Sequence, residues 1–438
     1  MMTSPTASGS SYTLGNSNLP LGYFPYDKLQ TVIPKTTGKA IIQYTGNTPV
    51  ADRFQYRPEA LYANGTNQTV QTYLEKGANA LYQQGRGNTS QLASLNAITA
   101  LQAGRNNQNR LDIQKTLNTL KQAGSGNVNQ AIVIKNLTNA IQEGNHTDNT
   151  LEVDGTLGSL TMGGQATDNT LNHYGDSTDL LLQYGNNLQN NIVHVGGEQP
   201  SNIKQFVSST TDSNNQATFD TVEEALLEGT GNQHKLTTWG SLGKIALKGE
   251  DNQFTINANE GIEKLGATGI NQTGSITNKG NKTTPSVAYL NGEASQWQYD
   301  GDGQQRLFVG GKNNNVTLVT STVEPKSGLN QDDKLVLAGK GNYIVADTGA
   351  GDDTVQVKLA DGEFKAELEG GEGNNTLLLE AGNWRSRKLA DGTTIYTRTD
   401  ASNPNGQPVQ TVVAKHFGKV RLIEALSSSS NTTNIDFN

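Results

Sequence analysis

The sequence has no cysteine among its 438 residues and no long apolar run. Without thiols the chain has no disulfide, no thiolate metal site and no cysteine nucleophile. No stretch approaches the roughly 18 apolar residues that a membrane-spanning helix needs. We therefore expect a protein that does not span a membrane and uses no thiol chemistry.

A basic stripe is also missing. The net charge is −8 at pH 7, and basic residues gather only around residues 385–388 and 415–421. A nucleic-acid surface needs a continuous row of lysine or arginine to meet the phosphates. The sequence therefore predicts no nucleic-acid partner.

Residues 1–26 lack the charged and apolar regions of a cleaved secretory signal peptide. They are rich in serine, threonine and glycine and contain no acid before Asp27, as in some bacterial proteins exported without cleavage. We expect a protein located outside the cell or on its surface that is exported in this way.

Proline is nearly absent from the middle of the chain. Six of the 11 prolines precede residue 59, and the next is Pro200. Because proline cannot donate to a β-ladder, this distribution sets residues 1–58 apart as an N-terminal arm. Ala40–Tyr44 reads as a strand, and the arm either caps the first coil or docks on a neighbouring molecule. The residues expected at such a self-assembly contact are Tyr23, Phe24, Tyr26, Ile41, Ile42 and Tyr44.

An evenly spaced repeat dominates the rest of the chain. Its turn glycines are Gly65, Gly85, Gly104, Gly124, Gly144, Gly164 and Gly185, and the same spacing resumes at Gly229, Gly249 and Gly269. Apolar residues keep register with them: Leu117, Leu137 and Leu157 each stand thirteen positions after a turn glycine. Self-similarity with a period of about 20 residues predicts a solenoid, in which each coil buries its apolar row only against its neighbours. The low hydrophobic fraction, 33%, suits so thin a core, and the kept register argues against disorder.

The predicted fold class is all-β with some short helices: a single-stranded β-solenoid, or β-helix, of about 20-residue coils. In the alanine- and leucine-rich coils each repeat reads as a short strand, the turn and a helical or 3₁₀ segment, because apolar residues lie three apart. From Gly144 on, each coil reads as strand on both sides of the turn. Residues 213–228 read as an isolated helix. The expected division is an arm (1–58), Ala/Leu-rich coils (59–143), β-solenoid coils (144–380) with loop excursions near 196–228, 280–291 and 320–333, a C-terminal cap (381–426) and a disordered tail (427–438).

Asparagines in the turns point to a structural role. Asparagine tolerates the left-handed region, and identical amides stacked about 4.8 Å apart can bond along the axis. Ligand binding is the alternative role. The residues expected in this asparagine ladder are Asn88, Asn107, Asn127, Asn232, Asn252, Asn314, Asn342 and Asn374.

Three turns resemble a known repeat. QQGRGN (83–88), QAGRNN (102–107) and QAGSGN (122–127) are similar to the Q-x-G-x-x-N turn of curlins, the subunits of bacterial curli. The resemblance implies an extracellular β-solenoid that polymerises coil on coil. The chain departs from the curlin pattern in its length and its leucine-rich interior.

A second resemblance covers residues 348–378. TGAGDDTVQ (348–356) matches the RTX calcium-binding nonapeptide G-G-x-G-x-D-x-U-x except at its first position, and GGEGNNTLL (370–378) carries Asn375 in place of the aspartate. RTX proteins hold Ca²⁺ in such turns. The resemblance therefore implies one Ca²⁺ at most, held by Asp352 and Asp353 with help from Asn374 and Asn375. No cofactor is expected to be required.

No catalytic set is apparent in the sequence. The five histidines are scattered, without a Ser-His-Asp order or metal-ligand spacing. His173 and His194 each stand nine positions after a turn glycine, which predicts that they stack in adjacent coils, as a ring pair or as a two-histidine metal or pH site. We expect a protein that is not an enzyme, because a carbohydrate-active β-helix enzyme would need an acid-lined groove.

These features favour a secreted or cell-surface structural protein. In this reading the chain is a self-assembling fibre or biofilm-matrix subunit that joins head-to-tail with copies of itself. A surface adhesin, or a glycan-binding β-helix protein whose partner is a surface polysaccharide, is the alternative.

Overall fold

The computed structural model describes residues 30–32, 41–45, 47, 49–175, 178–196, 201–279, 284–320, 332–360, 362–399 and 408–424. Within these ranges every regular element is a β-strand, so the chain has no helix there that could cross a membrane. The chain divides into two units, residues 1–219 and residues 220–438. Each unit is a β-solenoid in which every coil gives one strand to each of two sheets, named A and B.

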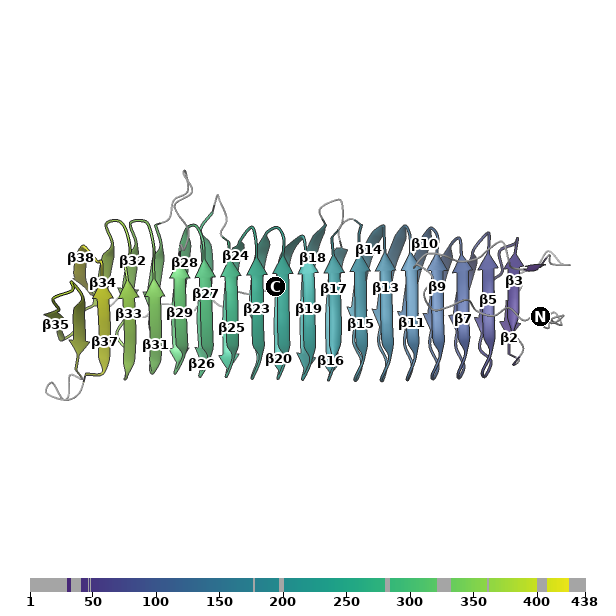
Figure 1. Ribbon diagram of the computed structural model, residues 1–438, viewed down its shortest axis with the longest axis horizontal. Coiled ribbons are helices and arrows are strands. Elements are labelled where there is room, and N and C mark those ends of the chain that lie inside the picture. Colours follow the sequence, from purple (N-terminus) through teal and green to yellow (C-terminus); the bar gives the residue numbers. More distant parts are fainter. Residues whose placement is uncertain are drawn as a thin grey trace. The chain divides into compact units, whose positions relative to one another are not determined.

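In the first unit both sheets are parallel stacks (Figure 1). Sheet A consists, in stacking order, of β1 (Gln30–Val32), β3 (Val50–Phe54), β5 (Thr69–Leu74), β7 (Thr89–Ser94), β9 (Gln108–Ile113), β11 (Val128–Val133), β13 (Asp148–Val153), β15 (Asp168–His173), β17 (Asn190–Val195) and β19 (Asn214–Phe219). Sheet B consists of β2 (Ile41–Tyr44), β4 (Ala60–Ala63), β6 (Ala78–Gln83), β8 (Ala97–Gln102), β10 (Thr116–Gln122), β12 (Asn136–Gln142), β14 (Thr156–Met162), β16 (Thr178–Asn186) and β18 (Asn202–Thr211).

The second unit repeats this plan and ends differently. Its sheet B is parallel throughout: β20 (Thr221–Thr230), β22 (Leu242–Leu247), β24 (Ile262–Ile270), β26 (Ser286–Glu293), β28 (Gln305–Lys312), β30 (Lys334–Leu337), β32 (Thr354–Val357), β34 (Thr376–Glu380) and β38 (Lys419–Ile423). Its sheet A is parallel through β21 (Gln233–Thr238), β23 (Gln253–Ala258), β25 (Thr273–Asn278), β27 (Gln296–Gly301), β29 (Asn315–Thr320), β31 (Asn342–Asp347), β33 (Phe364–Glu369) and β37 (Gln410–Lys415). Two antiparallel strands, β36 (Thr394–Arg398) and β35 (Trp384–Lys388), then extend sheet A.

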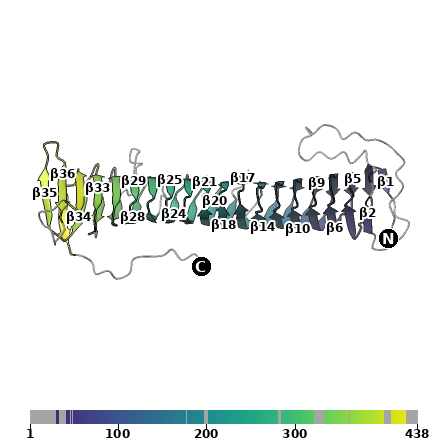
Figure 2. The same cartoon turned by 90° about the horizontal axis from the view of Figure 1, so that it is seen from below.

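The core of each unit lies between its two sheets, which are seen as two layers in Figure 2. Along a strand, side chains alternate between this core and the outer face. Leu117 on β10 pairs with Leu137 on β12, which pairs with Leu157 on β14, and each of the three side chains is at most 1% exposed. The β-solenoid and the register expected for its coils are thereby confirmed.

The expected short helices are wrong. The alanine- and leucine-rich segments of the first unit form strands β8, β10 and β12. On β10, Leu117 and Leu120 both face the core, and the two residues between them, Asn118 and Thr119, both face outward. This bulge gives the apolar residues the three-residue spacing of a helix.

The helix predicted at residues 213–228 is wrong for the same reason. They form strands β19 and β20, and on β20 the buried Val222 and Ala225 again lie three residues apart. Spacing alone therefore could not separate a bulged strand from a helix here.

Glycine recurs at the coil corner because the coils are too close for a side chain. Gly104 has a φ of 98°, in the region that favours glycine. A β-carbon at this position would lie 2.3 Å from the carbonyl oxygen of Gly85 in the preceding coil. The corner of one coil therefore stacks directly on the corner of the next.

The strand expected at Ala40–Tyr44 is present as β2. It pairs in parallel with β4, and its Ile42 and Tyr44 are buried, whereas Ile41 is exposed. The Tyr44 hydroxyl donates to Asp52 Oδ2 at 2.7 Å. Three other residues of the expected self-assembly contact, Tyr23, Phe24 and Tyr26, lie outside the described residues.

Candidate functional site

Most of the predicted turn asparagines are buried at the corner that leads from sheet B to sheet A. In the first unit Asn107 Oδ1 accepts a hydrogen bond from Asn88 N, one coil earlier, at 2.9 Å. Its Nδ2 donates to the carbonyl of Ala103, four residues back, at 2.7 Å. The other buried members are Asn127 in the first unit and Asn232, Asn252, Asn314 and Asn342 in the second. These amides thus donate to the backbone of their own corner and accept from the backbone of the preceding coil, and Asn232 Nδ2 also donates to Asn252 Oδ1 at 3.1 Å.

Two amide ladders that we did not predict run through the core of the first unit. Gln83, Gln102, Gln122 and Gln142 are joined from Nε2 to Oε1 at 2.8–2.9 Å. Six asparagines are joined from Nδ2 to Oδ1 at 2.8–3.1 Å: Asn109, Asn129, Asn149, Asn169, Asn191 and Asn215. The spacing in the sequence could have predicted both ladders. The glutamines stand two residues before the turn glycines, and four of the asparagines stand five residues after them.

The glutamine ladder is interrupted once. Met162 pairs with Gln142 on one side and with Gln183 on the other. All three side chains are buried, yet Gln142 Oε1 and both polar atoms of Gln183 have no hydrogen-bond partner. The thioether thus leaves two amides incompletely bonded in the core, an arrangement that costs stability.

The acidic residues of the RTX-like turns lie at the other corner, which leads from sheet A to sheet B in the second unit. An outer, exposed column holds Asp332, Asp352 and Asn374. Asp332 Oδ1 accepts from Asp352 N, and Asp352 Oδ1 accepts from Asn374 N, both at 2.8 Å. Asn374 is therefore an exposed residue of this corner, away from the buried asparagines described above.

An inner, buried column holds Asp333, Asp353 and Asn375. Asp353 Oδ1 accepts from Asp333 N at 2.8 Å, and Asn375 Oδ1 accepts from Asp353 N at 2.9 Å. Each aspartate thus accepts a hydrogen bond from the backbone N–H of the preceding coil, as the asparagines do at the opposite corner. Asn375 Nδ2 donates to backbone carbonyls, including that of His416 at 3.3 Å. The equivalent atoms of the aspartates, both Oδ2, have no hydrogen-bond partner.

Burial of these aspartates disfavours their charged form. It raises the pKa of Asp333 to about 8 and that of Asp353 to about 6. These two buried carboxylate oxygens could serve as ligands of a hard cation. Such a cation, however, prefers several carboxylate and carbonyl ligands. Within the described ranges, however, no group of three or more His, Cys, Asp or Glu side chains is placed to hold a metal ion.

The predicted histidine pair is wrong. His194 pairs in register with Asn172, and His173 pairs with Val195. His173 is buried in the core, whereas His194 lies on the outer side and meets the Tyr174 ring edge-on, with 6.3 Å between centroids. The corner after Gly185 holds one more residue than the corner after Gly164, so equal offsets from the two glycines do not give equal places in the sheet.

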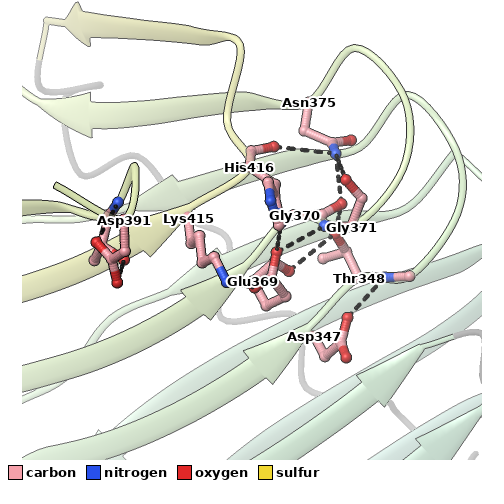
Figure 3. A network of polar contacts seen from close by, with 11 residues as sticks. Asp347, Thr348, Glu369, Gly370, Gly371, Asn375, Asp391, Lys415 and His416 are labelled. Carbon is pink, nitrogen blue, oxygen red and sulfur yellow. Dashed lines mark hydrogen bonds and ion pairs between the residues drawn. The ribbon is translucent and has the colours of Figure 1, made fainter. Parts of the chain in front are cut away.

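A polar network fixes the last described turn of sheet A (Figure 3). Glu369, at the end of β33, accepts hydrogen bonds from His416 Nδ1 and from Gly371 N. Lys415 Nζ lies 4.0 Å from its other oxygen. Asn375 Nδ2 binds the carbonyl of His416 from the next corner. These contacts tie the turn after β37 to the coil below it.

A pocket of about 370 Å³ adjoins this network. One wall comes from the β35–β36 hairpin, through Lys388, Thr394 and Tyr396. The other comes from the turn after β37, through Phe417 and its neighbours, and turn glycines form the floor. This pocket combines aromatic rings with a cation, and it is the candidate functional site.

The chemistry of the pocket suits binding better than catalysis. Its lining residues offer the ammonium group of Lys388, the hydroxyls of Thr394 and Tyr396, the rings of Tyr396 and Phe417 and the imidazole of His416, which binds Glu369. No protein-family model, no curated protein and no solved structure matches this chain.

Proposed function

We propose that this chain is a structural protein of the cell surface or extracellular space, a fibre or matrix subunit that joins head-to-tail with copies of itself. The supporting observation is the exposed end of sheet B. On β38, Val420 and Leu422 occupy the core register of Leu377 and Leu379 on β34. They are 41% and 62% exposed, whereas the two leucines are at most 1% exposed.

An end of this kind favours addition of another strand. The outer edge of β38 has no paired strand among the described residues, so its N–H and C=O groups face outward beside apolar side chains. Such an edge is a template for β-pairing with another chain. A head-to-tail contact that does not close grows into a filament.

Part of the outer face of sheet A in the second unit is polar and uncharged. On β23 the outward residues are Gln253, Thr255 and Asn257, and on β25 they are Thr273, Ser275 and Thr277. Such neutral polar faces give little drive for side-by-side association. Growth through the ends is therefore favoured over association along this part of the face.

Substitution at the end of the stack tests this function. Leu422→Lys is expected to keep the protein monomeric by light scattering under conditions in which the natural chain forms filaments visible by electron microscopy. The matched control is Ile98→Lys, at a side chain 45% exposed in the first unit, which is expected to polymerise normally. A natural chain that stays monomeric at high concentration would refute the proposal.

A surface adhesin is the second candidate, and the end pocket is the observation that favours it. Tyr396, Phe417 and Lys388 could receive a sugar ring that carries a negative charge. A glycan array with the natural chain and with Tyr396→Ala tests this alternative. If the natural chain does not polymerise, and if it binds a glycan that Tyr396→Ala does not bind, the adhesin function is favoured over the fibre function.

A further inference from the structure

The C-terminal end of the second unit is a step. Sheet A continues beyond β37 by two strands, β36 and β35, whereas the described part of sheet B stops at β38 (Figure 1). Because β37 and β38 stack on β33 and β34 of the previous coil, the two added strands have no described strand facing them. Sheet A therefore overhangs by the width of two strands, about 10 Å.

The inner side of the overhang carries side chains that a facing strand would cover. Tyr396 pairs with the buried Val412 and Thr394 with the buried Ala414, so both point to the core side. On β35 the corresponding residues are Ser386 and Lys388. Arg398 of β36, which pairs with the buried Gln410, and its partner Trp384 of β35 point to the same side. The pocket described above lies in this step, between the hairpin and the turn after β37.

The opposite boundary of the step is the edge of β38. It presents an open backbone edge together with the exposed Val420 and Leu422. A filler must therefore be extended, must offer apolar side chains at alternate positions and must bring no cation toward Lys388 and Arg398. These requirements describe a β-strand with apolar side chains at alternate positions and without lysine or arginine.

We infer that the step is filled by the N-terminal segment of a second copy of this chain, residues 1–29. Residues 1–26 contain no Asp, Glu, Lys, Arg or His, and they end in the aromatic run Tyr23, Phe24 and Tyr26. The segment is long enough for two strands of the length of β38, and its Leu19, Leu21 and Tyr23 stand at alternate positions. Its prolines, Pro5, Pro20 and Pro25, limit which of its amides can pair. It directly precedes β1, so its docking on β38 brings the first coil of one copy to the last coil of the next.

Residues 425–438 of the same chain are the other possible filler. This stretch is about half as long, opens with serines after Ala425 and Leu426, and has apolar residues at alternate positions only at Ile435 and Phe437. It therefore meets the requirements of the step less well. The inference rests on the proposed head-to-tail assembly and adds the segment and the surface that make the contact.

Because the chain has no natural cysteine, disulfide trapping can test the contact without background. Phe24→Cys and Leu422→Cys are made in separate full-length chains with different tags, mixed, assembled and oxidised. The mixed disulfide dimer is expected to exceed, by about tenfold or more, that of the control pair Phe24→Cys and Ile98→Cys, since docking raises the local thiol concentration. Circular dichroism verifies that each variant is folded.

Each other result overturns the inference in a distinct way. Filaments without enrichment at residue 422 would refute this contact and leave the head-to-tail function standing. If the natural chain does not assemble at all, both this contact and the head-to-tail function are refuted. A disulfide formed within one dilute chain that carries both cysteines would make the segment a cap of its own molecule. An intrachain disulfide between Tyr396→Cys and Ser430→Cys would show that residues 425–438 fill the step.

Discussion

The indole of Trp297 occupies the space that a side chain at Gly274 would need. The two residues pair in register on β25 and β27, and a β-carbon at position 274 would lie 2.0 Å from Cζ3 of the indole. The ring also stacks on Phe254 on β23, with 6.1 Å between centroids and 15° between planes. Glycine at this position lets two large rings from non-adjacent strands meet.

Gly274→Ala is expected to destabilise the second unit by about 1–3 kcal/mol, because the methyl group overpacks the core against the indole. Denaturant unfolding followed by tryptophan fluorescence measures the effect. Gly418→Ala is the control, since nothing lies within 4 Å of a β-carbon there. Trp297→Leu added to Gly274→Ala should recover part of the loss, and an unchanged midpoint for Gly274→Ala would contradict the packing.

Completing the glutamine ladder should stabilise the first unit. Met162→Gln gives Gln142 and Gln183 the amide partners that they lack. Each new hydrogen bond is worth about 0.5–1.5 kcal/mol net, and satisfying two buried amides removes a further penalty of about 1–3 kcal/mol each, which together outweigh the lost burial of the thioether. The thermal midpoint is expected to rise for Met162→Gln and to stay level or fall for Met162→Leu. Equal midpoints for the two variants would mean that the ladder carries no energy.

Replacing the two buried aspartates by asparagine should stabilise the second unit. In Asp333→Asn with Asp353→Asn, each Oδ1 keeps its backbone donor, and an NH₂ replaces the oxygen that lacks one. We expect a higher melting temperature than in the natural chain at neutral pH with EGTA, because two buried acids no longer have to be accommodated.

Calcium distinguishes the two readings of this corner. If Ca²⁺ raises the melting temperature of the natural chain but not that of the double asparagine variant, the aspartates hold a cation. If Ca²⁺ changes neither, the corner is structural. Loss of the circular-dichroism signal on adding EGTA alone would show a calcium-dependent fold, contrary to our expectation that other corners hold the coils together.

Acid should weaken the second unit through His234. Its ring stacks on Phe254 with 5.4 Å between centroids, and burial lowers its pKa to about 4 from an ordinary value of 6.5. Since the unfolded chain takes up the proton first, the stability from the neutral ring is present above pH 6.5 and is lost as the pH falls through 4. The loss is on the order of 3 kcal/mol once the ring is protonated.

The measurement compares unfolding free energies at about pH 7.5 and about pH 4 in the natural chain and in His234→Phe. The variant keeps the stack without a titrating group and is expected to lose less stability in acid. Identical acid losses in the two proteins would show that His234 does not contribute.

The sequence predicted the coils better than the site. The spacing of Leu117, Leu137 and Leu157 was sufficient, because parallel coils repeat one register. The bulge between Leu117 and Leu120 was not visible, since outward residues there carry no distinct signal. The pocket depends on the chain reversing from β35 to β36 and on the pairing of β36 with β37, contacts between segments that share no repeat. The polar ladders were missed because glutamine and asparagine are usually surface residues.

The register of the amide ladders also bears on how such a chain changes length over evolution. Gln102, Gln122 and Gln142 occupy equivalent places one coil apart, so removing or duplicating one whole coil returns every side chain to an equivalent neighbour. A change that is two residues shorter or longer than a coil would keep the alternation of the strands but move glutamine from its ladder into contact with leucine. Unequal recombination within the gene would therefore be tolerated mainly in whole coils, and related chains should differ in steps of about 20 residues.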